Sequence, residues 1–205
     1  MAKLLSSISN LTVWQFSNYK MLSIAEIKTG RNIILNNQPY AVLYHEHSKM
    51  GRAGSVLRTR LRNLSDGTIL EKTFQGADTI PEADISKTNA QFTYKENDDY
   101  NFMDSESYEQ FSLSKEALGD NVNYLKEGTE VTILNFNDSP INIELPIKIK
   151  LKVIETPPGI KGNTVSTGGK VVTVETGLKV STPLFVKAGD EIIINTERGE
   201  YVSRA

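Results

Sequence analysis

The chain has 205 residues, of which 39% are hydrophobic and 23% are charged, and this composition is typical of a globular protein. No stretch approaches the roughly 18 apolar residues that a membrane span requires, and the absence of cysteine excludes disulfides and thiol chemistry. The formal net charge is −2, but residues 84–146 hold four basic and thirteen acidic side chains, whereas 21–83 and 147–205 are net basic. This asymmetry suggests an anionic partner that contacts the ends of the chain and avoids its middle.

Residues 1–20 mix apolar and small polar side chains and carry only two charges, on Lys3 and Lys20. A secretory signal peptide needs a continuous apolar block, which this segment lacks. We expect either a poorly ordered extension or read-in sequence upstream of a start at Met21.

From residue 21 onward the pattern is mostly β, with short runs of β-branched residues between turn residues. The expected strands are 32–35, 40–44, 131–134, 147–153 and 192–194. Within 147–153 the alternation is strict, with apolar residues on one face and three lysines on the other. Helix is expected only near Ser114–Leu118, with Ser114 as N-cap, and near Asn121–Leu125.

One turn pattern, Lys-x-Gly followed by a β-branched residue, occurs three times. The copies are Lys28–Gly30 before Ile33, Lys126–Gly128 before Val131, and Lys187–Gly189 before Ile192. The last two copies lie 61 residues apart, about the length of one small five-stranded barrel. We therefore predict an all-β chain of three consecutive small barrels, at 21–83, 84–146 and 147–205.

Five basic residues and no acidic residue lie between positions 48 and 64: Lys49, Arg52, Arg58, Arg60 and Arg62. The last three are spaced by two, so a strand would place them on one face, with the residues between them toward the core. Guanidinium groups in a row suit the phosphates of an RNA backbone. A solvated basic strand is the alternative that the spacing leaves open.

Arg52 has a different setting, because Gly51 and Gly54 bracket it between the expected strands 40–44 and 56–61. Glycines in this arrangement indicate the tip of a β-hairpin. The tip would carry a cationic side chain far from the barrel, although an arginine that only keeps the loop solvated fits the same pattern.

The sequence resembles bacterial elongation factor P from Met21 to Arg204. The matching fragments are Ile27–Gly30, Lys49–Arg52, Glu71–Phe74, Phe102–Asp104, Tyr108–Gln110, Pro158–Gly162, Thr167–Lys170, Thr182–Val186 and Gly199–Arg204. The resemblance implies an N-terminal SH3-like, KOW-type barrel followed by two OB-fold barrels in an L-shaped arrangement. It also implies a cytoplasmic, monomeric translation factor that is not an enzyme and uses no cofactor or metal.

The function implied by the resemblance is to bind the ribosome between the P and E sites and to promote peptide-bond formation at polyproline stalls. The implied partners are both ribosomal subunits, the P-site peptidyl-tRNA and the mRNA. Proline is a poor nucleophile because its ring constrains the nitrogen. Holding the peptidyl-tRNA in a reactive pose would therefore lower the barrier.

By the same resemblance, Arg52 is the tip residue that reaches toward the peptidyl-transferase centre, in a loop formed with Lys49, Gly51, Ala53 and Gly54. Lysine-tipped members can be modified on the side-chain amine, whereas arginine-tipped members are rhamnosylated. Arg52 is therefore a candidate for rhamnosylation by a glycosyltransferase. Ala53 departs from the pattern, because lysine-tipped members usually have glycine there.

The resemblance assigns Gly162, Asn163 and Thr164 to a loop near the mRNA codon in the E site, where family members often have Gly-Asp-Thr. Asparagine keeps hydrogen-bonding capacity but loses the charge of aspartate. Tyr201 and Arg204 match terminal residues that contact the small subunit in the family.

Two alternative functions are a paralogue with a different ribosomal role and a general OB-fold RNA-binding protein. The second would bind single strands by stacking, and the scattered aromatic residues of this chain weaken it. His45 and His47 share a strand face, but two histidines without a third ligand do not make a metal site. No catalytic carboxylate pair of a hydrolase stands out in the acidic middle segment.

Overall fold

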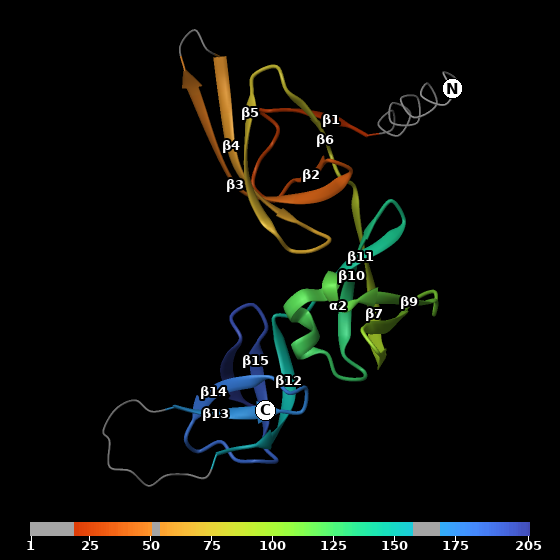
Figure 1. Cartoon of the computed structure of the whole chain (residues 1–205), viewed down its shortest axis with the longest axis vertical. Coiled ribbons are helices and arrows are strands. Elements are labelled where there is room, and N and C mark those ends of the chain that lie inside the picture. Colours follow the sequence, from red (N-terminus) through yellow and green to blue (C-terminus); the bar gives the residue numbers. More distant parts are fainter. Residues whose placement is uncertain (1–18, 51–53, 158–168) are drawn as a thin grey trace, which may run out of the picture. The chain divides into compact units, whose positions relative to one another are not determined.

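The structure is a computed structural model that describes residues 19–50, 54–157 and 169–205 (Figure 1). The described residues form four sheets, and their only helical elements are α2 (Lys115–Leu118) and the 3-10 helix η2 (Gly119–Tyr124). The strands are β1 (Met21–Ser23), β2 (Asn32–Leu35), β3 (Gln38–Met50), β4 (Gly54–Asn63), β5 (Ile69–Gln75), β6 (Thr79–Pro81), β7 (Ile85–Glu96), β8 (Asp99–Asp104), β9 (Gln110–Ser114), β10 (Glu130–Phe136), β11 (Ser139–Glu144), β12 (Lys148–Glu155), β13 (Gly169–Val174), β14 (Lys179–Pro183), β15 (Glu191–Asn195) and β16 (Glu200–Arg204).

The described part of the chain divides into two compact units. The first comprises the residues up to Ser86 together with Asn135–Ile141, and the second comprises Lys87–Leu134 with Asn142–Ala205. We call β1–β6 the first domain, β7–β11 with α2 and η2 the middle domain, and β12–β16 the C-terminal domain.

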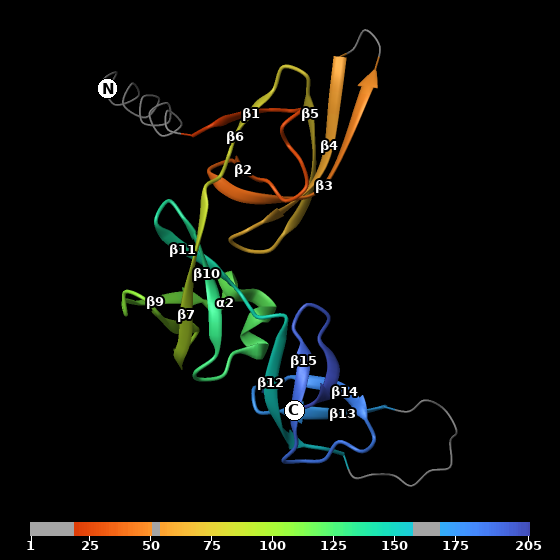
Figure 2. The same cartoon turned by 180° about the vertical axis from the view of Figure 1, so that it is seen from behind.

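The first domain contains a four-stranded sheet in the order β2-β3-β4-β5 and a separate pair, β1 with β6. β3 and β4 are its longest strands, and together they extend beyond the rest of the sheet (Figure 2). Its core consists of Leu22, Ile24, Ile27, Ile33, Tyr40, Val42, Leu57, Leu61, Phe74 and Ile80.

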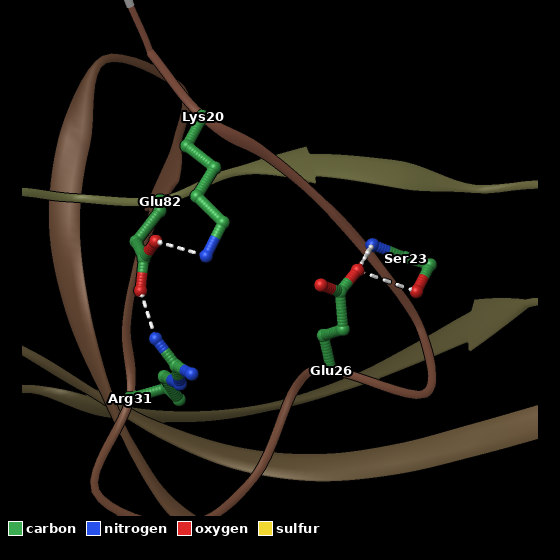
Figure 3. A network of polar contacts seen from close by, with 5 residues as sticks. All are labelled: Lys20, Ser23, Glu26, Arg31 and Glu82. Atoms are coloured by element: carbon green, nitrogen blue, oxygen red, sulfur yellow. Dashed lines mark hydrogen bonds and ion pairs between the residues drawn. The ribbon is translucent and has the colours of Figure 1, made fainter.

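A charged network holds the start of the first domain to the residue after β6 (Figure 3). Glu82 forms ion pairs with Arg31 and with Lys20, the latter at 3.5 Å. Beside it, Glu26 accepts hydrogen bonds from the hydroxyl and the backbone N–H of Ser23, at 2.7 and 2.9 Å. These two bonds favour the ionised form and lower the pKa of the Glu26 carboxyl below its usual value.

Two residues of the expected N-terminal extension lie within the described part of the chain, and both make specific contacts. The backbone carbonyl of Lys20 accepts a hydrogen bond from Glu82 at 2.8 Å. The hydroxyl of Tyr19 donates to Asn137 at 2.8 Å. The first unit therefore includes side chains from positions ahead of Met21.

The middle and C-terminal domains are each built on a five-stranded sheet, in the orders β11-β10-β7-β8-β9 and β14-β13-β12-β15-β16. The middle core is formed mainly by Ala90, Phe92, Tyr100, Phe102, Leu113, Leu118, Leu125, Val131, Ile133 and Ile143. The C-terminal core is formed mainly by Ile149, Leu151, Val153, Val172, Val174, Val180, Val186, Ile192 and Ile194.

The repeated Lys-x-Gly turn has the same structure in all three domains. The glycine has a positive φ each time, 87° at Gly30, 82° at Gly128 and 91° at Gly189. Glycine adopts this left-handed conformation without the penalty that a Cβ would bring. The residue after the glycine donates a hydrogen bond to the lysine carbonyl, at 2.9 to 3.2 Å, which closes the turn.

Each turn is also bound to a neighbouring strand through one buried residue: Val42 on β3, Phe92 on β7 and Val153 on β12. The carbonyl of that residue accepts from the glycine, its N–H donates to the carbonyl after the glycine, and all six distances are 2.8 or 2.9 Å. Directly beyond each of these residues the strand contains a β-bulge. The repeat predicted from the sequence is therefore confirmed as a structural repeat.

Tyr124, the last residue of η2, packs into the core of the C-terminal domain although it belongs to the middle domain. Its side chain is 8% exposed, and burial raises the pKa of its hydroxyl. Gly199 lies against that hydroxyl, since a Cβ there would be 3.3 Å from the oxygen. Leu145 packs against both cores, and Lys126 pairs with Glu175 at 3.2 Å. These contacts join the middle and C-terminal domains within the second unit.

The helix cap predicted at Ser114 agrees with the structure, whereas the strand predicted at 40–44 differs from it in length. Ser114 caps α2, because its hydroxyl accepts a hydrogen bond from the N–H of Ala117 at 3.3 Å. The strand expected at 40–44 is longer, Gln38–Met50. Asn36 and Asn37 both have positive φ and form a two-residue hairpin turn, so the strand resumes at Gln38.

We expect Tyr124→Ala to destabilise the C-terminal domain by about 3 kcal/mol, because it removes a buried ring and leaves a cavity at the junction. Tyr124→Phe keeps the ring and should cost about 1 kcal/mol or less. Urea unfolding followed by circular dichroism measures the cost, and hydrogen exchange localises it. Tyr94→Ala, which removes an exposed tyrosine from the middle domain, is the control. Unchanged exchange in β12 and β15 of Tyr124→Ala would refute the packing role.

Candidate nucleic-acid interface

The β3–β4 hairpin carries the stretch of basic residues. Its register runs without a shift from Tyr44 opposite Arg60 to Met50 opposite Gly54. The backbone of Lys49 pairs opposite Ser55 in this ladder. The three tip residues between the strands, Gly51, Arg52 and Ala53, lie outside the described residues.

Two histidines fix the stem of this hairpin. Nε2 of His47 and the hydroxyl of Ser55 are hydrogen-bonded at 2.6 Å, which ties β3 to β4. The backbone N–H of Thr29 donates to Nδ1 of His45 at 3.2 Å, which ties β3 to the first Lys-x-Gly turn. Within the described ranges, no group of three His, Cys, Asp or Glu side chains could hold a metal ion.

The alternation expected along β4 is confirmed. Arg58, Arg60 and Arg62 are exposed on one face of the strand. Leu57, Thr59 and Leu61 are at most 3% exposed on the other. The buried hydroxyl of Thr59 donates to the backbone carbonyl of Lys72 on β5 at 2.9 Å, so it is satisfied inside the domain.

Carboxylates from the neighbouring strands flank the arginines. Glu46 of β3 lies directly opposite Arg58, and Glu71 of β5 lies directly opposite Arg60. In the part of the chain that the structure describes, no ion pair joins these arginines to these glutamates. The arginine face is therefore an array of both charges rather than a purely basic strip.

A surface concavity lies in this array. Its lining consists of Tyr44, Glu46, Arg58, Thr59, Arg60, Glu71, Lys72 and Thr73. Tyr44 is 52% exposed although it sits within a β-strand. The sequence prediction did not include Tyr44, Glu46 or Glu71, because they join the arginines only through the register of β3 and β5.

The C-terminal domain has a second basic face. Lys148, Lys150 and Lys152 are exposed along β12 and the residues between them are buried, which confirms the predicted alternation. Lys150 pairs with Glu191 on β15 at 2.6 Å. The hydrogen bond from Lys150 and its charge hold the pKa of the Glu191 carboxyl below its usual value.

Two of the remaining predicted site residues, Tyr201 and Arg204, lie in the C-terminal domain. Gly162, Asn163 and Thr164 lie outside the described residues. Tyr201 on β16 is partly buried and packs against the C-terminal core. The side chain of Arg204 is 62% exposed at the end of β16, and its guanidinium pairs with Asp190 at 3.9 Å.

Family models match the chain in three consecutive segments. They are the elongation factor P KOW-like domain at residues 23–80, the elongation factor P OB domain at 85–143 and the elongation factor P C-terminal domain at 149–204. Curated proteins named elongation factor P from Dictyoglomus thermophilum and Carboxydothermus hydrogenoformans are 42% and 43% identical to the chain. Each alignment covers 90% of this chain and 100% of the relative.

The chain belongs to the elongation factor P family. A solved structure named eukaryotic translation initiation factor 5A from Methanococcus jannaschii covers 63% of the chain, with a TM-score of 0.53 and 16% identity. That likeness supports the fold alone.

The comparisons confirm several expectations from the sequence. The all-β fold with a KOW-type first domain followed by OB domains is confirmed, and so is the elongation factor P family. A translation factor, rather than an enzyme, agrees with this family membership. No helix among the described residues is long and apolar enough to cross a membrane. The assignment to an arginine-tipped branch stays a prediction.

Ser55→Ala should loosen the stem of the β3–β4 hairpin, because it removes the hydrogen bond to His47. We expect a loss of about 0.5–1 kcal/mol of local stability, since both groups are solvent-accessible. Hydrogen exchange of the amides at 47–57 measures it. Ser112→Ala on β9 is the control. Equal exchange in both variants would show that the bond does not stiffen the stem.

Proposed function

We propose that this chain is a translation elongation factor that binds the ribosome between the P and E sites and relieves polyproline stalls. The carrying observation is the β3–β4 hairpin, whose ladder continues unshifted to Met50 opposite Gly54. A long, regular stem of this kind can hold a tip residue at a fixed distance from the domain. Sequence identity above 40% with proteins named elongation factor P supports the same function.

The mechanism is positional. Arg52 reaches toward the peptidyl-transferase centre at the tip, while Arg58, Arg60 and Arg62 bind the backbone of the peptidyl-tRNA. Holding the acceptor end of the tRNA in a reactive pose lowers the entropic part of the activation barrier. This raises the rate at which a poorly nucleophilic proline attacks. The ribosome performs the chemistry, and the factor uses neither a cofactor nor a metal.

The C-terminal domain supplies the second attachment. The loop with Gly162, Asn163 and Thr164 lies near the mRNA in the E site, and Tyr201 and Arg204 contact the small subunit. The accessible guanidinium of Arg204 and the exposed lysines of β12 support a contact with RNA phosphate on this domain. The factor works as a monomer in the cytoplasm.

Arg52→Ala should slow synthesis across a Pro-Pro-Pro message by roughly tenfold or more, because a misaligned acceptor end loses much of the benefit of orientation. The measurement is a purified translation assay with wild-type and variant protein. A message without consecutive prolines should be unaffected, and Arg198→Ala, which removes an exposed arginine of the C-terminal domain, should behave as wild type. Equal rates for wild type and Arg52→Ala would remove Arg52 from the mechanism. A wild-type protein that gives no acceleration would overturn the function itself and favour a paralogue.

Arg52 should carry a rhamnose in protein purified from its native cell, added by a glycosyltransferase that recognises the tip loop. Intact-mass measurement should then show one deoxyhexose above the mass of the unmodified chain. Fragmentation should place it on the peptide that contains Arg52, and native-cell protein with Arg52→Lys should lack it. A native mass equal to that of the bare sequence would disprove the modification.

A further inference from the structure

The exposed face of β3, β4 and β5 holds two rows of side chains in fixed register. One row, across the three strands, is Glu46, Arg58 and Thr73. The next row is Tyr44, Arg60 and Glu71. Directly opposed side chains on neighbouring strands are about 5 Å apart, and rows on one face are about 7 Å apart. The two rows therefore form a patch a few residues wide around the concavity, which is lined by these six residues together with Thr59 and Lys72.

Each row places a guanidinium beside a carboxylate, yet within the described part of the chain these groups do not pair with each other. An exposed ion pair gains little in water, so leaving the groups apart costs little. The donors of Arg58 and Arg60 and the acceptors of Glu46 and Glu71 are thus available to a ligand that offers both kinds of partner.

Tyr44 adds an aromatic surface to this patch. It is 52% exposed and lies opposite Arg60 in the register. Proteins that bind single-stranded nucleic acids combine exposed aromatic rings with cationic side chains. The base stacks on the ring, and the phosphate binds the guanidinium. A paired duplex hides its bases, so it would leave both the ring and the carboxylates without partners.

We propose that this concavity binds one unstacked nucleotide of RNA. The base stacks on Tyr44, its N–H groups donate to Glu46 or Glu71, and the adjoining phosphate binds Arg58 and Arg60. Arg62, one row further along β4, continues the contact to the next phosphate. This inference rests on the proposed function for the source of the RNA, and it places the backbone contact of the arginines at the phosphates beside an unpaired residue.

The carboxylates argue against a simple polyanion as the ligand. Glu46 and Glu71 would repel inorganic phosphate or heparin at the positions that flank the guanidiniums. A nucleotide avoids this conflict because its base supplies hydrogen-bond donors beside its own phosphate. The patch therefore selects a ligand in which a negative charge and N–H donors lie a few ångströms apart.

The test uses the full chain and a labelled short single-stranded RNA, titrated at several KCl concentrations by fluorescence anisotropy. Tyr44→Ala should weaken binding roughly 5- to 150-fold, the range for loss of one stacked base, without changing the salt dependence. Tyr44→Phe keeps the ring and should bind within about threefold of wild type. Arg58→Gln should lower the slope of log affinity against log salt by about 0.7, the value for one phosphate contact on a single strand.

Tyr94→Ala is the matched control. Tyr94 follows the bulge of β7 as Tyr44 follows the bulge of β3, and it is 45% exposed, but it lies opposite Asn101 rather than an arginine. Its removal should leave binding unchanged. Thermal melts should show that all four variants are folded, because each substitution is at an exposed position outside the core.

Three outcomes overturn the inference: no binding of the wild-type chain to the single strand, equal affinity of Tyr44→Ala and Tyr94→Ala, or equal binding of a duplex of the same sequence. The Pro-Pro-Pro assay separates this failure from that of the proposed function. If wild type accelerates proline synthesis but Tyr44 does not affect RNA binding, only the nucleotide site is wrong. If RNA binding depends on Tyr44 but synthesis is not accelerated, the site stands and the elongation function falls.

Discussion

The left-handed glycine of the Lys-x-Gly turn is the constraint on which the architecture of all three domains depends. At Gly30, Gly128 and Gly189 a residue with a side chain would be strained at this positive φ, by about 1–2 kcal/mol, although its Cβ would meet no close neighbour, and this strain favours opening of the turn. Opening would break the pair of hydrogen bonds that joins each turn to its neighbouring strand. Those bonds set the register at which the strand after the turn pairs with its neighbour. The backbone conformation of one glycine therefore determines how β2, β10 and β15 each join their sheet.

The bulge beyond each bound residue has a consequence for the surface. In a regular strand Tyr44 would share the face of Val42 and point into the core, because side chains alternate with a period of two. The extra residue reverses that alternation, so Val42 is buried and Tyr44 is exposed. Phe92 and Tyr94 show the same reversal in the middle domain. The bulge that keeps Val42 and Phe92 in the core therefore also places the rings of Tyr44 and Tyr94 on the surface.

These features explain what the sequence could and could not predict. The alternation along β4 is regular between Leu57 and Arg62, so spacing alone placed the arginines on one face. The cap at Ser114 was predictable because capping is local. The partners of the arginines were not, since Glu46 and Glu71 reach them through cross-strand register, and the bulge in β3 shifts that register by one residue. Periodicity within one strand carries no information about either effect.

The mixed array of charges bears on how a protein of net charge −2 would dock on RNA in the proposed function. A purely basic strip would attract any polyanion through counterion release, and its affinity would extend to RNA without the right structure. With Glu46 and Glu71 interleaved among the three arginines, the long-range attraction is reduced, and binding depends more on short-range contacts that only a suitable ligand completes. A factor that must enter the ribosome, act and leave benefits from this balance, because specificity then comes from geometry at the site rather than from charge at a distance.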